Sequence, residues 1–538
     1  MEIYCFSPFG YAGELIKVEA DLRRGIPSID IVGLPDGAVR ESRERMRAAI
    51  RNAGLEFPLE RILINLSPAG LRKEGSGFDL PIALAVLVAS NGLGTGPDEG
   101  AALVVGELEL SGRVRGARGI LAAVTLARKN GITLCLVPRE NEEEARLAGS
   151  GSIAGVSSLS EAFHCLLAGS AKLAYAPDAG EPDRAMAPNS RSAAEGAIRW
   201  PSEPGADLAT VRGQPTLLRA LEIAAAGGHH LLAYGAPGSG KTLALSRFSA
   251  LLPLLDEETA LVVTRIHSIA GLTGPDRHPD ALVSNAPFRS PHQGASLEGM
   301  AGGGRACVPG EMSLAHGGVL FLDEAHLFRG PVIQSLRGPL ETGRVAVSRA
   351  GRSSVFPARF QLLLALNPCP CGNFGIPDRT CVCLPEAIER HWRRFTAPLL
   401  DRIDLRIEVR PPDPERLIEE AEIPLADARA RIARALAAQR ERQMDEVPPA
   451  ERDVGGCPWK NGFLPPEGIA RHCVLRGRAK EVFVRGSRAQ CLSGRGAHGV
   501  LRVARTIADL AGRAEISVDD VEEALGLRRW AGALADFL

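Results

Sequence analysis

The spacing of hydrophobic and polar positions divides this 538-residue chain into three blocks and one irregular stretch. In the first block, residues 1–168, short apolar runs at 29–32 and 61–66 predict strands. Helical spacing of apolar and basic positions over 38–53 predicts an amphipathic helix, and the almost wholly apolar run 78–90 predicts a buried one. We therefore expect a mixed α/β domain at the front of the chain.

The pattern changes over residues 169–205, where prolines interrupt Ala, Gly, Ser and charged residues, and this predicts an exposed linker. Residues 206–410 alternate strand-like apolar runs with helical segments, which is typical of a parallel sheet covered by helices. Residues 411–538 are mostly helical in pattern. The predicted helices there are 426–443, 499–511 and 521–527, the last after a capping sequence at Ser517. The expected fold class is α/β: an α+β front domain, a parallel-sheet domain and a small all-α domain.

Composition adds little to this picture. The 63 Lys and Arg balance 64 Asp and Glu, so the formal net charge of −1 argues neither for nor against a nucleic-acid partner. No apolar run approaches the roughly 18 residues that a membrane span needs, and the first six residues lack the features of a secretory signal. We expect a cytoplasmic protein without membrane contact, whose 11 cysteines are reduced thiols or metal ligands.

A glycine-rich loop lies between the predicted strand 229–234 and a predicted helix that begins at Thr242. The loop residues are Gly235, Ala236, Pro237, Gly238, Ser239, Gly240, Lys241 and Thr242. Glycines let backbone N–H groups cradle phosphates, Lys241 supplies charge at the β- and γ-phosphates, and the Thr242 hydroxyl can hold Mg²⁺. A plain glycine-rich turn is the alternative. The flanking strand and helix favour an ATP-binding loop with ATP and Mg²⁺ as cofactors.

Two further predicted strands end in polar residues suited to nucleotide hydrolysis. The strand 318–322 ends at Asp323, which can coordinate Mg²⁺ through water, and Glu324, which can polarise the attacking water. The strand 360–366 ends at Asn367, whose amide can hydrogen-bond a γ-phosphate and orient water. Taken alone, the acidic pair is equally an ordinary strand end, and Asn367 is better explained as a strand-terminating turn. Beside the glycine-rich loop, they predict an ATPase.

Four cysteines form two Cys-x-Cys pairs, Cys369 with Cys371 and Cys381 with Cys383, around a loop rich in Gly, Pro and Asp. Four thiolates can hold Zn²⁺ tetrahedrally and staple a loop that has little core of its own. The usual spacing is Cys-x-x-Cys. Four reduced thiols or labile disulfides therefore stay open as alternatives to structural Zn²⁺.

With these motifs, the sequence resembles the magnesium-chelatase-like AAA+ ATPases of the YifB/ComM family over nearly its whole length. The stretches that carry the resemblance are 33–45, 71–75, 78–84, 211–214, 287–292, 309–311, 399–405 and 503–510. The family implies a hexameric ring with ATP sites between subunits. Arg402 then looks like the arginine finger that reaches a neighbour's γ-phosphate, with Arg393 and Arg394 as competing candidates. Arg495 resembles the second sensor arginine of a helical lid, with Arg502 as its competitor.

The same resemblance implies work on DNA, namely helicase or branch-migration activity in recombination and natural transformation. Such enzymes move DNA with loops that protrude into the ring's pore, and two inserts fit that role, 284–305 and 343–359. Their candidate contacts are Arg289, His292, Arg344, Arg349, Arg352 and Arg359. The alternative is a solvated basic hairpin that packs against a neighbouring subunit.

The front block also looks like a Lon protease domain, through the strand and turn 106–114 and the segment 136–141 behind it. Lon-type cleavage needs a serine that is activated by a lysine. The nucleophile position falls on Gly77 and the lysine position on Leu121, while Ser76 is one residue off. The domain is therefore expected to be non-proteolytic and to help in assembly or substrate engagement.

Three functions stay open at this level. The leading one is an ATP-driven motor whose partner is single-stranded or branched DNA. The second is the ATPase subunit of a chelatase that inserts Mg²⁺ into a porphyrin, and the third is a remodeller of protein complexes that does not act on nucleic acid. The Lon-like front block and the fused helical lid favour the motor, because the chelatase ATPase subunit lacks that front block.

Overall fold

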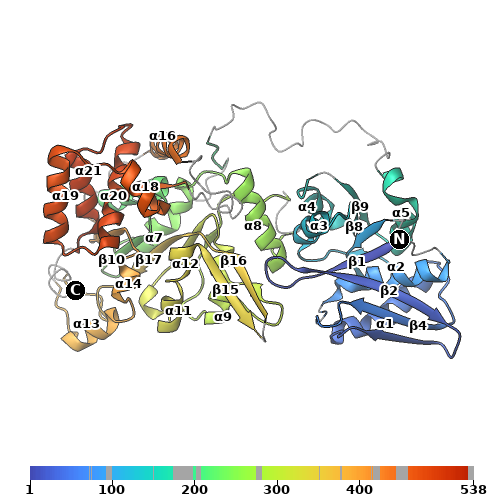
Figure 1. Ribbon diagram of the computed structural model, residues 1–538. Coiled ribbons are helices and arrows are strands. Elements are labelled where there is room, and N and C mark those ends of the chain that lie inside the picture. The colour runs from blue at the N-terminus through green and yellow to red at the C-terminus, as the bar shows by residue number, and fades with distance from the viewer. Residues whose placement is uncertain are drawn as a thin grey trace.

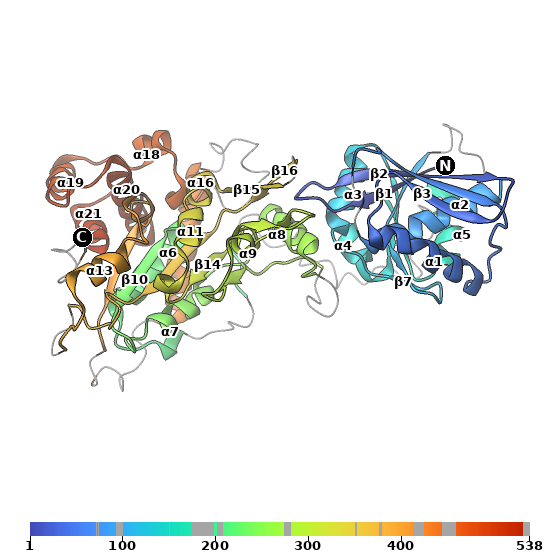
Figure 2. The same cartoon turned by 90° about the horizontal axis from the view of Figure 1, so that it is seen from below.

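The computed structural model describes residues 1–71, 73, 75–92, 100–149, 151–173, 198–201, 208–273, 281–349, 352–375, 379–412, 415, 424–443 and 459–530. Three parts follow one another along the molecule: a front domain (residues 1–173), a sheet core (208–412) and a helical lid (424–530) (Figure 1, Figure 2). The linker expected at 169–205 lies largely outside the described residues. Among the described residues, no helix is long and apolar enough to cross a membrane.

The front domain is built on a seven-stranded mixed sheet with the strand order β3-β4-β2-β1-β5-β8-β9. β2 pairs antiparallel with β1 and β4, whereas the other neighbours run parallel. The strands are β1 (Glu2–Ser7), β2 (Glu14–Arg23), β3 (Ser28–Val32), β4 (Arg61–Ser67), β5 (Ala101–Val104), β8 (Leu134–Pro138) and β9 (Ser152–Val156). The main helices are α1 (Gly37–Asn52), α2 (Asp79–Ser90), α3 (Ile120–Lys129), α4 (Glu142–Arg146) and α5 (Leu159–Leu173). The four elements expected here from the sequence are confirmed within a residue at each end.

The side chain of Asp79, on α2, binds two residues of α1. Its fully buried carboxylate, at the start of α2, accepts hydrogen bonds from the hydroxyl of Ser42 and the guanidinium of Arg45, both on α1. The Arg45 Nε–Asp79 Oδ2 distance is 2.8 Å. Removing one partner of a buried ion pair costs about 3–5 kcal/mol, because the other charge is left uncompensated. The pair therefore fixes α1 against α2.

The sheet core contains five parallel strands in the order β11-β14-β17-β10-β18. They are β11 (Phe288–Arg289), β14 (Val319–Leu322), β17 (Gln361–Leu366), β10 (Leu231–Gly235) and β18 (Leu405–Val409). The three central strands are buried along their whole length, as expected when helices cover both faces of a parallel sheet. Helices of this part include α6 (Pro215–Gly227), α7 (Lys241–Ser246) and α8 (Glu257–Ala270). The parallel sheet expected in this block is confirmed.

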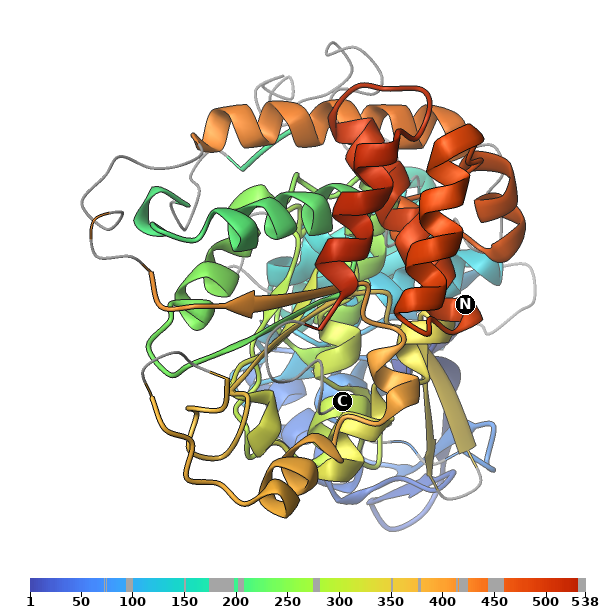
Figure 3. The same ribbon diagram turned by 90° about the vertical axis from the view of Figure 1, so that its left-hand side faces the viewer.

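The helical lid consists of α16 (Leu425–Gln443), α18 (Pro466–His472), α19 (Gly477–Ala489), α20 (Gly494–Leu510) and α21 (Val518–Arg528), the orange and red helices at the front of Figure 3. α20 begins five residues before the helix expected at 499–511, because the side chain of Ser493 accepts a hydrogen bond from the N–H of Gly496 and caps the helix there. The capping sequence at Ser517 is confirmed. Ser517 and Asp520 form a reciprocal capping box at the start of α21.

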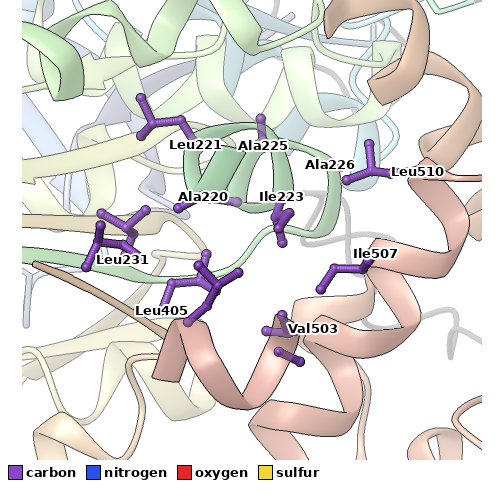
Figure 4. Close-up of a cluster of buried hydrophobic side chains, with 14 of the residues drawn as sticks. Ala220, Leu221, Ile223, Ala225, Ala226, Leu231, Leu405, Val503, Ile507 and Leu510 are labelled. Carbon is purple, nitrogen blue, oxygen red and sulfur yellow. The ribbon is translucent and has the colours of Figure 1, made fainter. Parts of the chain in front are cut away.

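The lid and the sheet core share one hydrophobic core. Val503, Ile507 and Leu510 on α20 lie close to Ile223 and Ala226 on α6, and all five side chains are buried (Figure 4). α6 packs against β18 as well, so it is buried between the sheet and the lid. Because this apolar surface is excluded from water only while the lid is docked, its burial holds the lid on the core.

Buried polar contacts cross the same boundary. In the sheet core, His229 Nδ1 lies 2.9 Å from Asp404 Oδ2. On the lid side, His229 Nε2 lies 2.8 Å from the hydroxyl of Thr506, and Arg528 donates to the carbonyl oxygen of Ile403 at 2.9 Å. Directional bonds of this kind select one orientation of the lid, which apolar packing alone does not.

A β-hairpin joins the sheet core to the front domain. Its strands, β15 (Arg344–Arg349) and β16 (Arg352–Pro357), meet the turn between β1 and β2 (Figure 1, Figure 2). Arg352 forms an ion pair with Glu14 at 2.5 Å, and its guanidinium lies 3.5 Å from the centre of the Phe9 ring. The backbone N–H of Tyr11 donates to the Ser354 hydroxyl at 2.9 Å. The hairpin thus packs against the chain's own front domain.

Candidate nucleotide-binding site

The glycine-rich loop follows β10, which lies between β17 and β18 in the sheet. A side chain cannot be placed at Gly235, since a Cβ there would lie 2.0 Å from the carbonyl oxygen of Val409. Gly238 and Gly240 have φ angles of +79° and +89°, a region that residues with a Cβ rarely adopt. The loop therefore depends on these three glycines for its path, and α7 begins directly after it at Lys241.

Lys241 is the charged centre of this loop. Its Nζ donates to the carbonyl oxygens of Gly235 at 2.8 Å and Ala236 at 2.6 Å, and it lies 3.4 Å from the Ser239 hydroxyl. Burial lowers the pKa of Lys241 to about 8. Because these hydrogen-bond acceptors are neutral, a polyphosphate would supply the counter-charge that a buried ammonium favours.

The affinity for ATP is expected to fall as the pH rises from 7 to 9. With a pKa of about 8, Lys241 is mostly protonated at pH 7 and largely neutral at pH 9, and only the ammonium attracts phosphate. The dissociation constant of a fluorescent ATP analogue should therefore rise about tenfold at pH 9. Lys241→Arg is the control, since its guanidinium stays protonated and should give a flat profile. A flat profile for the unchanged chain would contradict this expectation.

Asp323 and Glu324 follow β14 at the same edge of the sheet. Oδ1 of Asp323 accepts hydrogen bonds from the Thr242 hydroxyl and from the N–H of Glu324, both at 3.0 Å. The loop threonine and the strand acid thus meet at one point, and hard oxygen donors of this kind suit Mg²⁺. Glu324 is exposed and has a φ of +47°, a conformation that costs about 1–3 kcal/mol and is often found at functional sites.

Asn367 follows β17 and completes the polar end of the sheet. Tyr234 pairs with Leu366, so Asn367 lies in the position opposite Gly235. Its backbone oxygen accepts a hydrogen bond from Nε2 of His391, on α13 (Pro385–Trp392), at 2.9 Å. This position places Asn367 beside the loop, as the sequence predicted.

The sequence analysis missed a pair of histidines beside this site. The rings of His326 and His391 are 4.9 Å apart. Burial lowers the pKa of His326 to about 4, and the nearby charge of Lys241 adds to the effect, so His326 is neutral at physiological pH. The available signal was that His326 follows Glu324 by two positions in Asp-Glu-Ala-His.

Arg402 and Arg495 lie at the opposite edge of the sheet. Arg402 comes after α14 (Ala397–Leu400) and three residues before β18, whose first residue Leu405 pairs with Leu231 at the start of β10. The five residues of β10 separate this edge from the loop by roughly 16 Å. Arg402 and Arg495 both bind the carboxylate of Glu341, so the structure brings the two together.

The competing arginines have other partners. Arg394 donates to the backbone oxygen of His326, on the same side of the sheet as the loop, and Arg393 forms an exposed ion pair with Glu389 at 2.7 Å. Arg502 lies 3.4 Å from Asp404 and donates to the oxygen of Gly462 at 2.9 Å. Of these arginines, Arg402 and Arg495 are the two that share one carboxylate, that of Glu341.

The four cysteines of the two Cys-x-Cys pairs come together. Cys369, Cys371, Cys381 and Cys383 place their sulfur atoms within 4.8 Å of one another. The Sγ–Sγ distances among Cys369, Cys371 and Cys381 are 3.4 to 3.7 Å, close to the roughly 3.8 Å edge of a tetrahedron with 2.3 Å zinc–sulfur bonds. The loop also touches the nucleotide loop, because a Cβ on Gly372 would lie 2.5 Å from Pro237 Cδ. The donor set fits Zn²⁺.

The sheet order, the glycine-rich loop after β10 and the acids after β14 define a P-loop ATPase of the AAA+ class. Comparison with family models agrees. "Magnesium chelatase, subunit ChlI" matches residues 207–417, "Subunit ChlI of Mg-chelatase" matches 18–141, and "Magnesium chelatase, subunit ChlI C-terminal" matches 424–528. The three matches cover parts of the front domain, the sheet core and the lid.

Individual proteins are similar over almost the whole chain. Competence protein ComM of Haemophilus influenzae is 36% identical over 527 residues, which are 98% of this chain and 97% of that protein. YifB of Escherichia coli is 37% identical over 516 residues, covering 95% and 94%. The 38 kDa magnesium-chelatase subunit of Acidiphilium rubrum is 28% identical over 180 residues, which are 29% of this chain and 51% of that protein. The chain belongs to the YifB/ComM family of magnesium-chelatase-like AAA+ ATPases.

Proposed function

We propose that this chain is an ATP-driven motor that acts on single-stranded or branched DNA, in recombination or natural transformation, and hydrolyses ATP between the subunits of a hexameric ring. One observation carries the proposal. The loop and acids lie at one edge of the sheet, and Arg402 and Arg495 lie at the other, roughly 16 Å away. Because neither half can reach the other within one chain, two copies are needed to complete the site.

Each residue then has a chemical role. Lys241 binds the β- and γ-phosphates, and Thr242 with Asp323 would hold Mg²⁺, which neutralises charge on the phosphates. Glu324 polarises the attacking water, and Asn367 orients it against the γ-phosphate. Arg402 of a neighbouring copy stabilises the charge that develops as the γ-phosphate leaves.

DNA as the substrate is supported by the full-length similarity to a competence protein and by the two basic inserts. Within these inserts Arg289 is paired with Glu311 at 2.7 Å and Arg352 with Glu14, so both are tied inside the chain. His292, Arg305 and Arg344 are exposed and are the described residues best placed for phosphate contact. The side chain of Arg349 lies outside the described residues, and Arg359 stacks 5.7 Å from the Phe463 ring.

The front domain is proposed to be a non-proteolytic Lon-like domain. Leu121, at the expected lysine position, is buried, and its N–H donates to Glu144 at 2.9 Å. Gly77 carries no nucleophile, and the side chain of Ser76 lies outside the described residues. The contacts of Phe9, Tyr11 and Glu14 with the hairpin instead support a role in holding the β15–β16 hairpin.

Structural Zn²⁺ at the four cysteines is part of the proposal. Purified protein is expected to contain about one zinc per chain by mass spectrometry, since the donors match a closed tetrahedral site. Cys371→Ser should lose the metal and lower the melting temperature by about 5–10 °C, and it should weaken ATP binding because the loop touches Pro237. Cys491→Ser, an exposed cysteine outside the cluster, is the control. Metal-free wild-type protein with the same melting temperature would refute the site.

The steady-state ATPase rate with single-stranded, duplex and branched DNA tests the motor. Stimulation by single-stranded or branched DNA of about threefold or more is expected, because substrate engagement and hydrolysis are coupled in a motor. Lys241→Ala removes the phosphate-binding charge and shows that the rate belongs to this protein. A rate indifferent to every DNA would favour the alternative, a chelatase-type or protein-remodelling ATPase, to which the partial similarity to a magnesium-chelatase subunit points.

A further inference from the structure

Glu341 joins three elements at the edge of the sheet away from the nucleotide loop. It lies on α12 (Pro339–Thr342), directly before the hairpin strand β15. One of its carboxylate oxygens binds Nη2 of Arg402, and the other binds Nη2 of Arg495 at 2.8 Å. Arg402 follows α14 in the sheet core, whereas Arg495 lies in the first turn of α20 in the lid. A single carboxylate thus holds two arginines from two parts of the chain.

The surroundings of Glu341 favour anions. It lines a cavity of about 1220 Å³ between the sheet core and the lid. Cations outnumber carboxylates at this cavity: its lining includes Arg344, Arg359, Arg402, Arg471, Arg495 and Arg502, against Glu341, Asp404 and Glu467. The hydrogen bond from Arg402 lowers the pKa of Glu341, and the nearby charge of Arg495 adds to the effect. Glu341 is therefore ionised at neutral pH.

Another anion can replace the Glu341 carboxylate as the partner of Arg402 and Arg495. Each arginine uses one Nη atom rather than a two-pronged contact, which is the weaker arrangement. The Glu341 side chain is 51% exposed, while that of Arg402 is only 9% exposed. Nε of Arg402 is buried with no hydrogen-bond partner among the described residues. A phosphate group carries more charge and three oxygens, so it can satisfy both arginines better than one carboxylate can.

We propose that Glu341 is a positioning residue that holds Arg402 and Arg495 in place of a phosphate until the γ-phosphate of a neighbouring subunit's ATP displaces it. This inference rests on the proposed function, since it requires that Arg402 act on a neighbour's nucleotide. The inference adds that the Glu341 carboxylate competes with the γ-phosphate for Arg402 and Arg495. Because each subunit carries this carboxylate, Glu341 weakens the contact that two subunits make around ATP.

Glu341→Gln in the full chain tests the competition, because the amide keeps the shape and removes the charge. The ATPase rate is measured against the concentration of ATP and of protein. Both half-saturating concentrations are expected to fall about two- to fivefold, the range for removal of a partly exposed ion pair, while kcat is retained. Glu341→Asp keeps the charge but shortens the reach, and it should give a smaller decrease. Glu515→Gln, which breaks an exposed ion pair with Arg476 elsewhere in the lid, should change neither value.

A second comparison separates this inference from the proposed function. If unchanged protein hydrolyses ATP and Arg402→Ala does not, the part of the proposed function that the inference needs, hydrolysis with Arg402, holds, and Glu341→Gln alone decides the inference. Unchanged half-saturating concentrations, or a loss of kcat at a normal melting temperature, would overturn it. The double variant Glu341→Gln/Arg402→Ala should be as inactive as Arg402→Ala alone, because release of Arg495 does not replace the arginine that acts on the γ-phosphate. If Arg402→Ala is as active as the unchanged chain, the proposed site between subunits is refuted, whatever Glu341→Gln shows.

Discussion

Glu324→Gln is expected to lower kcat for ATP hydrolysis by about 10²–10⁴-fold, the range for loss of a general base. The amide keeps the shape of the side chain but no longer attracts a proton from water. Binding of ATP should be preserved, because Lys241 and the Thr242–Asp323 contact are untouched. Single-turnover hydrolysis of radiolabelled ATP measures the chemical step, and equilibrium filtration measures binding.

The matched control for this change is Glu258→Gln, an exposed glutamate in the first turn of α8. It carries the same chemical change outside the site and should hydrolyse ATP at the normal rate. Two results would refute the role of Glu324: full activity of Glu324→Gln, or a lost activity that is explained by lost ATP binding.

Arg402→Ala is expected to lower kcat by about 10³-fold or more while ATP binding by each subunit is retained, because an arginine finger acts on the transition state rather than on the ground state. Binding should be retained because Arg402 lies far from the nucleotide loop of its own chain. Arg393→Ala and Arg394→Ala, at the competing positions, should retain most of the activity. A normal rate for Arg402→Ala together with a lost rate for Arg394→Ala would reverse the assignment.

Mixing two inactive variants tests whether the site lies between subunits. A Lys241→Ala subunit lacks the loop charge but presents Arg402, and an Arg402→Ala subunit binds ATP but presents no finger. A mixed ring therefore contains interfaces in which an intact loop meets an intact arginine. Activity should reappear on mixing and should depend on the ratio of the two proteins. If both halves acted within one chain, the mixture would stay inactive.

The nucleotide loop could be predicted from the sequence because its chemistry is local. Gly235, Gly238, Gly240, Lys241 and Thr242 lie within eight positions, so their spacing alone constrains the backbone that they can form. The strands that precede Asp323, Glu324 and Asn367 could also be predicted, because each is a continuous apolar run. The start of α20 was placed too late, because the apolar stripe begins after the Ser493 cap that starts the helix.

Contacts between distant segments could not be predicted in this way. Arg402 was identified by resemblance, but its partner Glu341 is 61 positions away, and Arg495 is 154 positions from the same glutamate. Arg352 was expected to contact DNA, and in the structure it is bound to Glu14, 338 positions earlier. An isolated arginine in a sequence does not reveal which carboxylate neutralises it.

The sequence by itself determined the fold class, the phosphate-binding loop, the acids that follow β14 and the two cysteine pairs, since each depends on short-range spacing or on the period of apolar positions. Only the tertiary structure decided that the loop and Arg402 lie at opposite edges of one sheet, that Glu341 joins Arg402 to the lid, and that the four sulfur atoms meet beside Pro237. The physical reason is that these relations depend on which strands pair and how the lid packs. Burial of many weakly specific apolar side chains settles both together, so no single motif encodes them.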